Sequence, residues 1–268
     1  MTYEIFLTDS VEDAKVATAR AILSGFTQIN EQHRFTRIQH HEPRDSAVKG
    51  FSTIKQLQKE RRPTTPQWQE LHQILVKQPS FLELRTDITE EVEAQNAMSV
   101  AGGGEAPFIN IPIGKPCALR WTDLPDPPIP QLPYITQRKL VEIADPRAET
   151  TLADNKFRAK SDLIEESYHW WLDGIEYVLT RMFVITLDPD PAAPRQIPNL
   201  AVLEPVSPHW ILYVRASVDS LPAATIPQRM TEGQGHLERV RKELVNVFNF
   251  MIFDRRCRDP RIHEPRAA

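Results

Sequence analysis

The chain contains one Glu-x-Glu sequence, formed by Glu91 and Glu93. On a strand, this spacing would place both carboxylates on one face, where their oxygens could bind a divalent cation and support metal-dependent hydrolysis. However, residues 89–116 combine further glutamates and three consecutive glycines with few large hydrophobic side chains before Phe108. We therefore expect the first half of this range to be disordered. Because a catalytic metal needs ligands on rigid elements, the pair does not predict a metal site.

Three histidines, His33, His40 and His41, are candidate zinc ligands. Adjacent residues of a strand point to opposite faces, so His40 and His41 cannot easily converge on one ion. We therefore expect all three side chains to be solvated.

The glycine run at residues 102–104 could be read as a phosphate-binding loop. It lacks the lysine and the helix start that such a loop needs, and the chain has no Gly-x-Ser-x-Gly nucleophile sequence. We interpret the run as a flexible tether. The sequence predicts no cofactor.

The composition indicates one globular protein without a strong charge. The 268 residues are enough for a substantial core, and no long linker divides them, so we expect one domain rather than two. The formal net charge of −4 gives no general attraction to DNA or to an anionic membrane. Since no signal peptide or membrane span is recognisable, we expect a soluble protein in which Cys117 and Cys257 are reduced thiols rather than a disulfide.

The clearest local structure is a long β-hairpin predicted over residues 157–185. Asp173 and Gly174 can supply the positive φ angles of a two-residue turn. Each facing pair then matches in polarity or charge, which favours this register over a slip of one residue. The predicted pairs are Leu172–Ile175, Trp170–Tyr177, Tyr168–Leu179, Glu166–Arg181 and Ile164–Phe183.

Alternating side chains predict further strands at residues 3–8, 34–41 and 209–218. Residues 81–88 also alternate, although neither face of this strand is cleanly apolar. Residues 42–64 are polar and basic, which indicates a surface loop.

Helical spacing of apolar residues predicts three helices. The first covers residues 16–26, follows a capping box that begins at Ser10, and stops near Gly25. The second begins at Thr65, and the third is an amphipathic helix over residues 237–251. The apolar face of the second helix comprises Trp68, Leu71 and Leu75.

The centre of the chain, from Cys117 to Ile143, excludes helix. An apolar strand is followed by five prolines between residues 125 and 133, and each proline removes a hydrogen-bond donor and extends the residue before it. We expect two strands joined by a stiff loop.

Together these elements predict an α+β fold that is mainly an antiparallel β-barrel with flanking helices. In such a barrel, Trp170 and Trp171 place indoles on both faces of one strand. They form either a two-sided core or one core side chain and one partner-binding side chain.

Four segments of the chain resemble the fungal Mediator subunit 18 family. They are Tyr3–Thr8, Leu119–Pro128, Thr136–Lys139 and the hairpin end Leu179–Arg181. The resemblance spans most of the chain, whereas the loops at 42–64 and 89–116 match nothing useful.

This resemblance implies a non-enzymatic subunit of the Mediator head module that regulates RNA polymerase II transcription in the nucleus. It implies a heterodimer with Mediator subunit 20, a tether formed by a helix of Mediator subunit 8, and contacts with other head subunits and the RNA polymerase II machinery. We expect one barrel domain over residues 1–268, with flexible insertions at 42–64 and 89–116. The basic tail from Arg255 to Arg266 is either a solvated terminus or a contact for an acidic partner or for nuclear targeting.

The family also resembles, in fold, the tunnel phosphohydrolases, including fungal RNA triphosphatases. Their N-terminal strand carries a metal-binding Glu-x-Glu sequence, whereas here Glu4 is followed two residues later by Phe6. Because one carboxylate cannot form that metal site, phosphohydrolysis is the disfavoured alternative. Five residues are candidates for partner binding or for a structural role. They are Trp121, Asp123, Arg138, Trp170 and Trp171.

Overall fold

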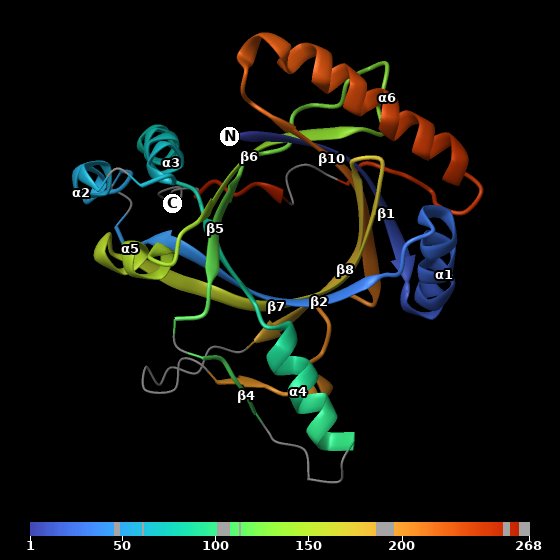
Figure 1. Cartoon of the computed structure of the whole chain (residues 1–268), viewed down its shortest axis with the longest axis horizontal. Coiled ribbons are helices and arrows are strands. Elements are labelled where there is room, and N and C mark those ends of the chain that lie inside the picture. The colour runs from blue at the N-terminus through green and yellow to red at the C-terminus, as the bar shows by residue number, and fades with distance from the viewer. Residues whose placement is uncertain are drawn as a thin grey trace, which may run out of the picture.

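The computed structural model shows a closed antiparallel barrel of eight strands (Figure 1). It describes residues 1–45, 49–60, 62–100, 108–112, 114–185, 196–253 and 258–262. In order around the barrel, the strands are β1 (Thr2–Glu12), β10 (His209–Asp219), β8 (Ile175–Ile185), β7 (Phe157–Leu172), β2 (Gln32–Pro43), β3 (Leu82–Asp87), β5 (Cys117–Thr122) and β6 (Thr136–Ala144). This confirms the predicted fold class.

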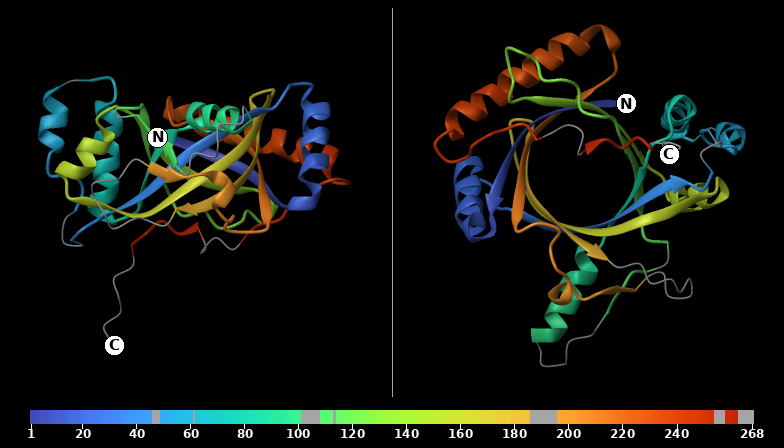
Figure 2. Two further views of the ribbon diagram at one scale, coloured as in Figure 1. Left: turned by 90° about the horizontal axis from the view of Figure 1, so that it is seen from below. Right: turned by 180° about the vertical axis from the view of Figure 1, so that it is seen from behind.

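The helices lie outside the barrel, as the views from below and from behind in Figure 2 show. The α-helices are α1 (Val16–Thr27), α2 (Ile54–Lys59), α3 (Thr65–Lys77), α4 (Thr89–Val100), α5 (Ala148–Asp154) and α6 (Ile226–Leu244). Three short 3-10 helices are η1 (Asp13–Lys15), η2 (Leu200–Val202) and η3 (Ala223–Thr225). A separate two-stranded sheet joins β4 (Phe108–Asn110) to β9 (Gln196–Pro198).

Three hydrophobic cores lie between the barrel wall and the elements that cover it. Helices α1 and α6 pack on β1, β7, β8 and β10, whereas α2, α3 and α5 pack on β3, β5 and β6. Helix α4 and the β4–β9 sheet cover the third part of the wall. Because the apolar residues of each strand face these outer cores, the alternate residues face the lumen.

The predicted hairpin is confirmed with its register. β7 and β8 pair in the predicted way, including Trp170 opposite Tyr177 and Glu166 opposite Arg181. Asp173 and Gly174 have φ angles of 50° and 77°, as a two-residue hairpin turn requires.

The start of α1 differs from the prediction. Ser10 caps no helix, because β1 continues to Glu12 and Ser10 pairs with Ile211 of β10. At its other end, α1 continues past Gly25 to Thr27, and Gln28 ends the helix in the left-handed region at a φ of 56°.

Helix α6 begins earlier and ends earlier than the predicted range of 237–251. It ends at Leu244 because Phe248 folds back into the outer core, where it is 3% exposed. The chain then crosses β1, and the backbone N–H of Met251 donates to the carbonyl oxygen of Thr8 at 2.9 Å. Val247 is consequently exposed instead of lying on an apolar helix face.

The expected disorder in the first half of residues 89–116 is wrong for residues 89–100, which form α4. The helix is anchored by Ile88 and Val92, which are buried in the third core. The glycine run at 102–104 lies outside the described residues. Within 42–64, β2 extends to Pro43 and α2 forms at Ile54–Lys59, so part of the expected loop is regular structure.

Candidate functional site: the charged lumen of the barrel

The lumen wall carries several charged side chains of both signs among uncharged ones. Because register fixes which strand positions face inward, residues far apart in the sequence meet there. Those that form ion pairs are Glu4, Glu83, Arg85, Arg120, Arg138, Glu142, Glu165, Glu176 and Arg215, and His169 forms a hydrogen bond to Glu176.

Glu4 of β1 holds the two strands that flank it. Arg138 of β6 donates from Nε to Glu4 Oε2 at 2.6 Å, and Arg215 of β10 donates to Glu4 Oε1 at 3.3 Å. Burial raises the pKa of Glu4, but the two guanidinium groups outweigh it and hold the pKa below its usual range. Both oxygens of this carboxylate are therefore occupied by arginine.

Glu176 of β8 extends the same network. Arg215 donates from Nε to Glu176 Oε2 at 2.7 Å, and His169 Nδ1 lies 2.9 Å from Glu176 Oε1. Burial raises the pKa of Glu176, but the hydrogen bonds from His169 and Arg215 lower it to about 2. The carboxylate stays ionised at neutral pH.

A second network connects β3, β5, β6 and β7. Arg85 donates to Glu83 at 3.1 Å and to Glu165 at 2.8 Å, and Arg120 donates to Glu142 at 2.7 Å. Burial lowers the pKa of Arg85, but the two glutamates outweigh it and raise the pKa above its usual range. These arginines neutralise the lumen glutamates.

Phe6 occupies the lumen position where a second acidic residue of a Glu-x-Glu pair would lie. Its ring is 1% exposed and lies 5.9 Å from the ring of Tyr213. The guanidinium of Arg138 lies 5.1 Å from the Phe6 centroid, as in a cation–π contact. The strand thus presents one carboxylate and an aromatic ring that contacts a neighbouring arginine.

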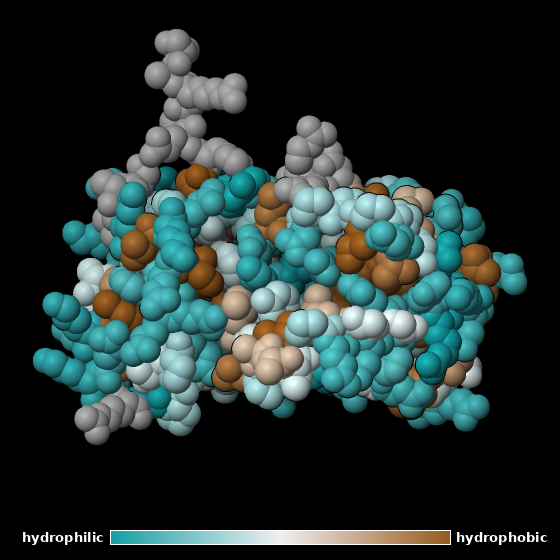
Figure 3. Space-filling view, turned by 90° about the horizontal axis from the view of Figure 1, so that it is seen from above, coloured by the Kyte–Doolittle hydropathy of each residue, from teal (hydrophilic) through white to brown (hydrophobic). Residues whose placement is uncertain are grey.

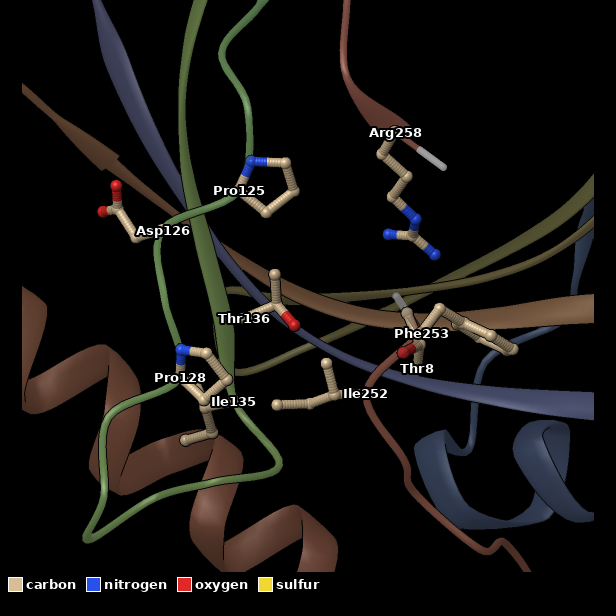
Figure 4. Close-up of a pocket in the computed structure, with 9 residues that line it drawn as sticks. All are labelled: Thr8, Pro125, Asp126, Pro128, Ile135, Thr136, Ile252, Phe253 and Arg258. Atoms are coloured by element: carbon tan, nitrogen blue, oxygen red, sulfur yellow. The ribbon is translucent and has the colours of Figure 1, made fainter. Parts of the chain in front are cut away.

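The open space of the lumen is a cavity of about 390 Å³. Its lining includes His40, Arg120, Arg138 and Tyr213 from the wall, and residues 258–260 from the C-terminal segment. Arg258 also reaches a neighbouring apolar cavity of about 240 Å³, lined by Pro125 of the proline-rich loop. Figure 4 shows the Arg258 side chain directed toward this space from the C-terminal segment.

The five candidate residues do not come together. Trp121 is 5% exposed on the outer face of β5, and Trp170 is fully buried on the outer face of β7, where its Nε1 donates to Ser24 at 3.0 Å. Arg138 faces the lumen. Asp123 accepts the backbone N–H of Leu124 at 2.8 Å, just after β5.

Trp171 faces the other way from Trp170, so the predicted two-sided arrangement is only partly a core. The indole of Trp171 is half-buried, stacks on His169 with a centroid distance of 5.6 Å, and lies 5.5 Å from the guanidinium of Arg34.

The Glu91–Glu93 pair lies on α4, outside the barrel, and not on a strand. Residues two apart on a helix point to different sides, so the two carboxylates do not share a site. Glu91 pairs with Lys115, and Glu93 is exposed. Within the part of the chain that the structure describes, no three metal-ligating side chains gather into a site.

The three histidines depart to different degrees from the expected solvated state: the side chain of His33 is still 37% exposed, whereas the ring nitrogens of His41 are buried. His33 stacks on Tyr168 with a centroid distance of 4.3 Å, and His40 Nδ1 lies 2.8 Å from Ser161 Oγ in the lumen. His41 is enclosed, and burial followed by the charge of His40 lowers its pKa to about 4.

Two further expectations concern thiols and membranes. Cys117 is a free thiol on the outer face of β5, where burial raises its pKa, and Cys257 lies outside the described residues. Among the helices of the described ranges, none has the length and apolar character needed to cross a bilayer.

The lumen network was missed from the sequence, although one signal pointed to it. The alternation in residues 81–88 has two imperfect faces because Glu83 and Arg85 face the lumen while Leu82 and Leu84 face the outer core. A strand that is charged on one face and apolar on the other is typical of a barrel with a polar interior.

Comparison with known proteins gives relatives in fold. The chain resembles a chain of the Schizosaccharomyces pombe Mediator head module, with a TM-score of 0.56 and 12% identity over 92% of this chain and 97% of that one. It also resembles HpAC1 from Hippeastrum, a protein named for adenylyl cyclase and described as having a dominant triphosphatase activity, with a TM-score of 0.42 and 11% identity over 96% and 94% of the two chains. No curated protein matches the sequence.

The family comparison covers nearly the whole chain. The family model described as Med18 protein matches residues 3–261, which include seven barrel strands in full and all of β1 except Thr2. This confirms the resemblance that the sequence showed. The chain therefore belongs to the Med18 family and is a subunit of Mediator, the coactivator complex that regulates transcription by RNA polymerase II.

Proposed function

We propose that this subunit acts in the nucleus as a non-catalytic interaction protein of the Mediator head module, pairing with Mediator subunit 20 and held by a helix of Mediator subunit 8. Its whole length would act as one barrel domain with insertions at 42–64 and 89–116. The observation that carries the non-catalytic part is the state of the lumen, where arginines bind the glutamates that a phosphohydrolase would use for a metal.

The electrostatics of Glu4 support this proposal. A divalent cation would have to displace Arg138 and Arg215 from the carboxylate, and the neighbouring inward position is Phe6, which offers no oxygen. Metal-dependent catalysis also needs several oxygen ligands directed at one point. The lumen instead stabilises the barrel through paired charges.

Exposed apolar side chains support a role in binding proteins. Three valines are largely exposed: Val184 by 50%, Val202 by 67% and Val206 by 60%. Val206 lies beside β8, where its backbone N–H donates to the carbonyl oxygen of Met182 at 2.8 Å. On the face shown in Figure 3, hydrophobic residues form several small patches between hydrophilic ones. A partner that covers these valines would remove apolar surface from water, which favours association.

Of the five candidate residues, we assign partner contact to Trp171 and structural roles to the other four. Trp171 is a half-exposed aromatic residue, the type most enriched at interface centres. Trp121 and Trp170 are buried, Arg138 binds Glu4, and Asp123 holds the turn after β5.

Co-expression with subunit 20 tests the partner assignment. We expect a stable heterodimer in size-exclusion chromatography, weakened by Trp171→Ala and retained by Trp171→Phe. Val247→Ala, an exposed apolar change elsewhere on the surface, serves as the matched control. A chain that remains monomeric beside subunit 20 would contradict the proposal, and a tagged chain excluded from nuclei would contradict the location.

A phosphate-release assay tests the non-catalytic part. With triphosphate-ended RNA and Mg²⁺ or Mn²⁺, we expect release no faster than in buffer. Metal-dependent release that disappears in the Glu4→Gln variant would favour the phosphohydrolase alternative instead.

A further inference from the structure

The described C-terminal segment, residues 258–262, lies across one mouth of the barrel. Its backbone pairs with the residues that precede β3, in short antiparallel fashion. The N–H of Phe81 donates to the Pro260 carbonyl at 2.8 Å, and the N–H of Ile262 donates to the Pro79 carbonyl at 3.1 Å. Figures 1 and 2 show this red segment at the edge of the ring of strands.

Arg258 anchors the segment to the lumen through aromatic rings. Its guanidinium lies 5.2 Å from the centroid of Tyr213 and 5.5 Å from those of Phe6 and Phe253. The arginines of the wall bind glutamates, whereas among the described residues no carboxylate forms an ion pair with Arg258. Because aromatic rings and not a carboxylate hold Arg258, the arginine of another peptide could occupy the same position on these rings.

The other two charged residues of the segment, Asp259 and Arg261, carry opposite charges and bind each other. Asp259 accepts from Nε of Arg261 at 2.6 Å, so this pair adds no net charge at the mouth. Backbone pairing supplies affinity without selecting side chains, and an arginine pocket supplies selection. The mouth thus has both parts of a peptide-binding site.

We infer that this mouth is a binding site for an extended peptide in which arginine precedes Asp-Pro, and that residues 258–262 fill the site in cis. A segment on the same chain has a high effective concentration, so it excludes a free peptide of the same sequence. Weakening the cis segment should open the site to a peptide in trans.

The test uses the full chain and a fluorescent peptide with the sequence of residues 258–268. We expect the Arg258→Ala chain to bind this peptide at least about tenfold more tightly than the unaltered chain, because its own segment competes less well. Arg258→Lys should fall between the two, since lysine keeps the charge but loses the planar guanidinium. Arg239→Ala, an exposed arginine of α6, is the matched control and should behave like the unaltered chain.

Amide exchange at Phe81 provides a second measurement on the same variants. Its N–H is bound by Pro260, so its exchange should accelerate in Arg258→Ala and slow again when the peptide is added. Equal peptide affinity for the unaltered and Arg258→Ala chains, or unchanged exchange at Phe81, would overturn the inference. A peptide with alanine in place of its arginine that binds equally well would also overturn it.

Discussion

Trp121 is a packing residue of β5. It is 5% exposed in the core beneath α3 and α5, and in the described structure its Nε1 has no hydrogen-bond partner. Its contribution therefore comes from the buried ring rather than from a polar contact. We expect Trp121→Ala to reduce the free energy of unfolding by about 3–5 kcal/mol and Trp121→Phe to cost much less. Urea unfolding measures both. An alanine variant of unchanged stability that loses subunit 20 would make this residue an interface residue.

Glu176 gives the barrel a pH-dependent component of stability. Hydrogen bonds from His169 and Arg215 lower its pKa to about 2 in the folded chain. The ionised form is thus favoured by folding, and the stabilisation is present above the unfolded pKa, near 4.3, and lost as the pH falls toward about 2.

We therefore expect the unfolding free energies of the unaltered chain and the Glu176→Gln variant to differ most above pH ~5, by roughly 3 kcal/mol, and to converge on acidification. Denaturant titrations between pH 3 and 7 measure the difference. Glu232→Gln, on the exposed surface of α6, is the control and should give no such trend. A difference that is constant with pH would contradict the assignment.

At the scale of residues, the sequence predicted which side chains are buried but not which side chains they contact. The packed roles of Trp121 and Trp170 follow from apolar strands in a barrel covered by helices. The role of Arg138 does not, because its partner Glu4 lies 134 residues away and meets it only when the barrel closes. The sequence itself shows that Phe6 and not a carboxylate stands two residues after Glu4, but the contacts of the Phe6 ring with Tyr213 and Arg138 also depend on the closed barrel.

Helix α6 depends on a close approach at one of its two glycines. A Cβ added at Gly233 would lie 2.9 Å from Ile5 Cδ1, whereas one added at Gly235 would meet nothing within 4 Å. Alanine favours helix over glycine by about 1 kcal/mol, so Gly235→Ala should raise the unfolding free energy by up to that amount. Gly233→Ala should give a smaller gain or a loss, because α6 or Ile5 must shift. Urea unfolding compares the matched pair, and equal stabilisation by both changes would refute the close contact.

At the scale of elements, what could be predicted is what depends on neighbours in sequence. The β7–β8 register follows from one Asp-Gly turn and complementary pairs, and α3 follows from a proline and an apolar stripe. By contrast, α4 has a weakly apolar sequence and is anchored by Ile88 and Val92 against distant strands. The end of α6 likewise depends on Phe248 reaching the outer core. In both cases, contacts with residues far away in the sequence determine where the helix forms or ends.

The β1–β6 contact, which closes the barrel, is the shorter of the two contacts that β1 makes with its neighbours. Between β1 and β6 the register has five pairs, from Thr2 to Phe6, whereas β7 and β8 share eleven. Glu4 lies in the middle of this seam and binds Arg138 on one side and Arg215 on the other. Hydrogen bonds to charged groups are among the stronger ones, so Glu4 contributes directly to the stability of this seam. The β7–β8 hairpin makes no contact with Glu4 in its eleven pairs and should depend on it less.

Glu4→Gln should therefore open the barrel locally at the seam. We expect amide exchange in β6 to accelerate about tenfold, corresponding to about 1.4 kcal/mol of local stability, while exchange in the β7–β8 hairpin changes little. Hydrogen exchange read by mass spectrometry separates the two regions, and Glu232→Gln, at an exposed position of α6, is the control. A uniform acceleration in both regions would show that Glu4 stabilises the whole fold and not the seam, since global unfolding exposes every strand together.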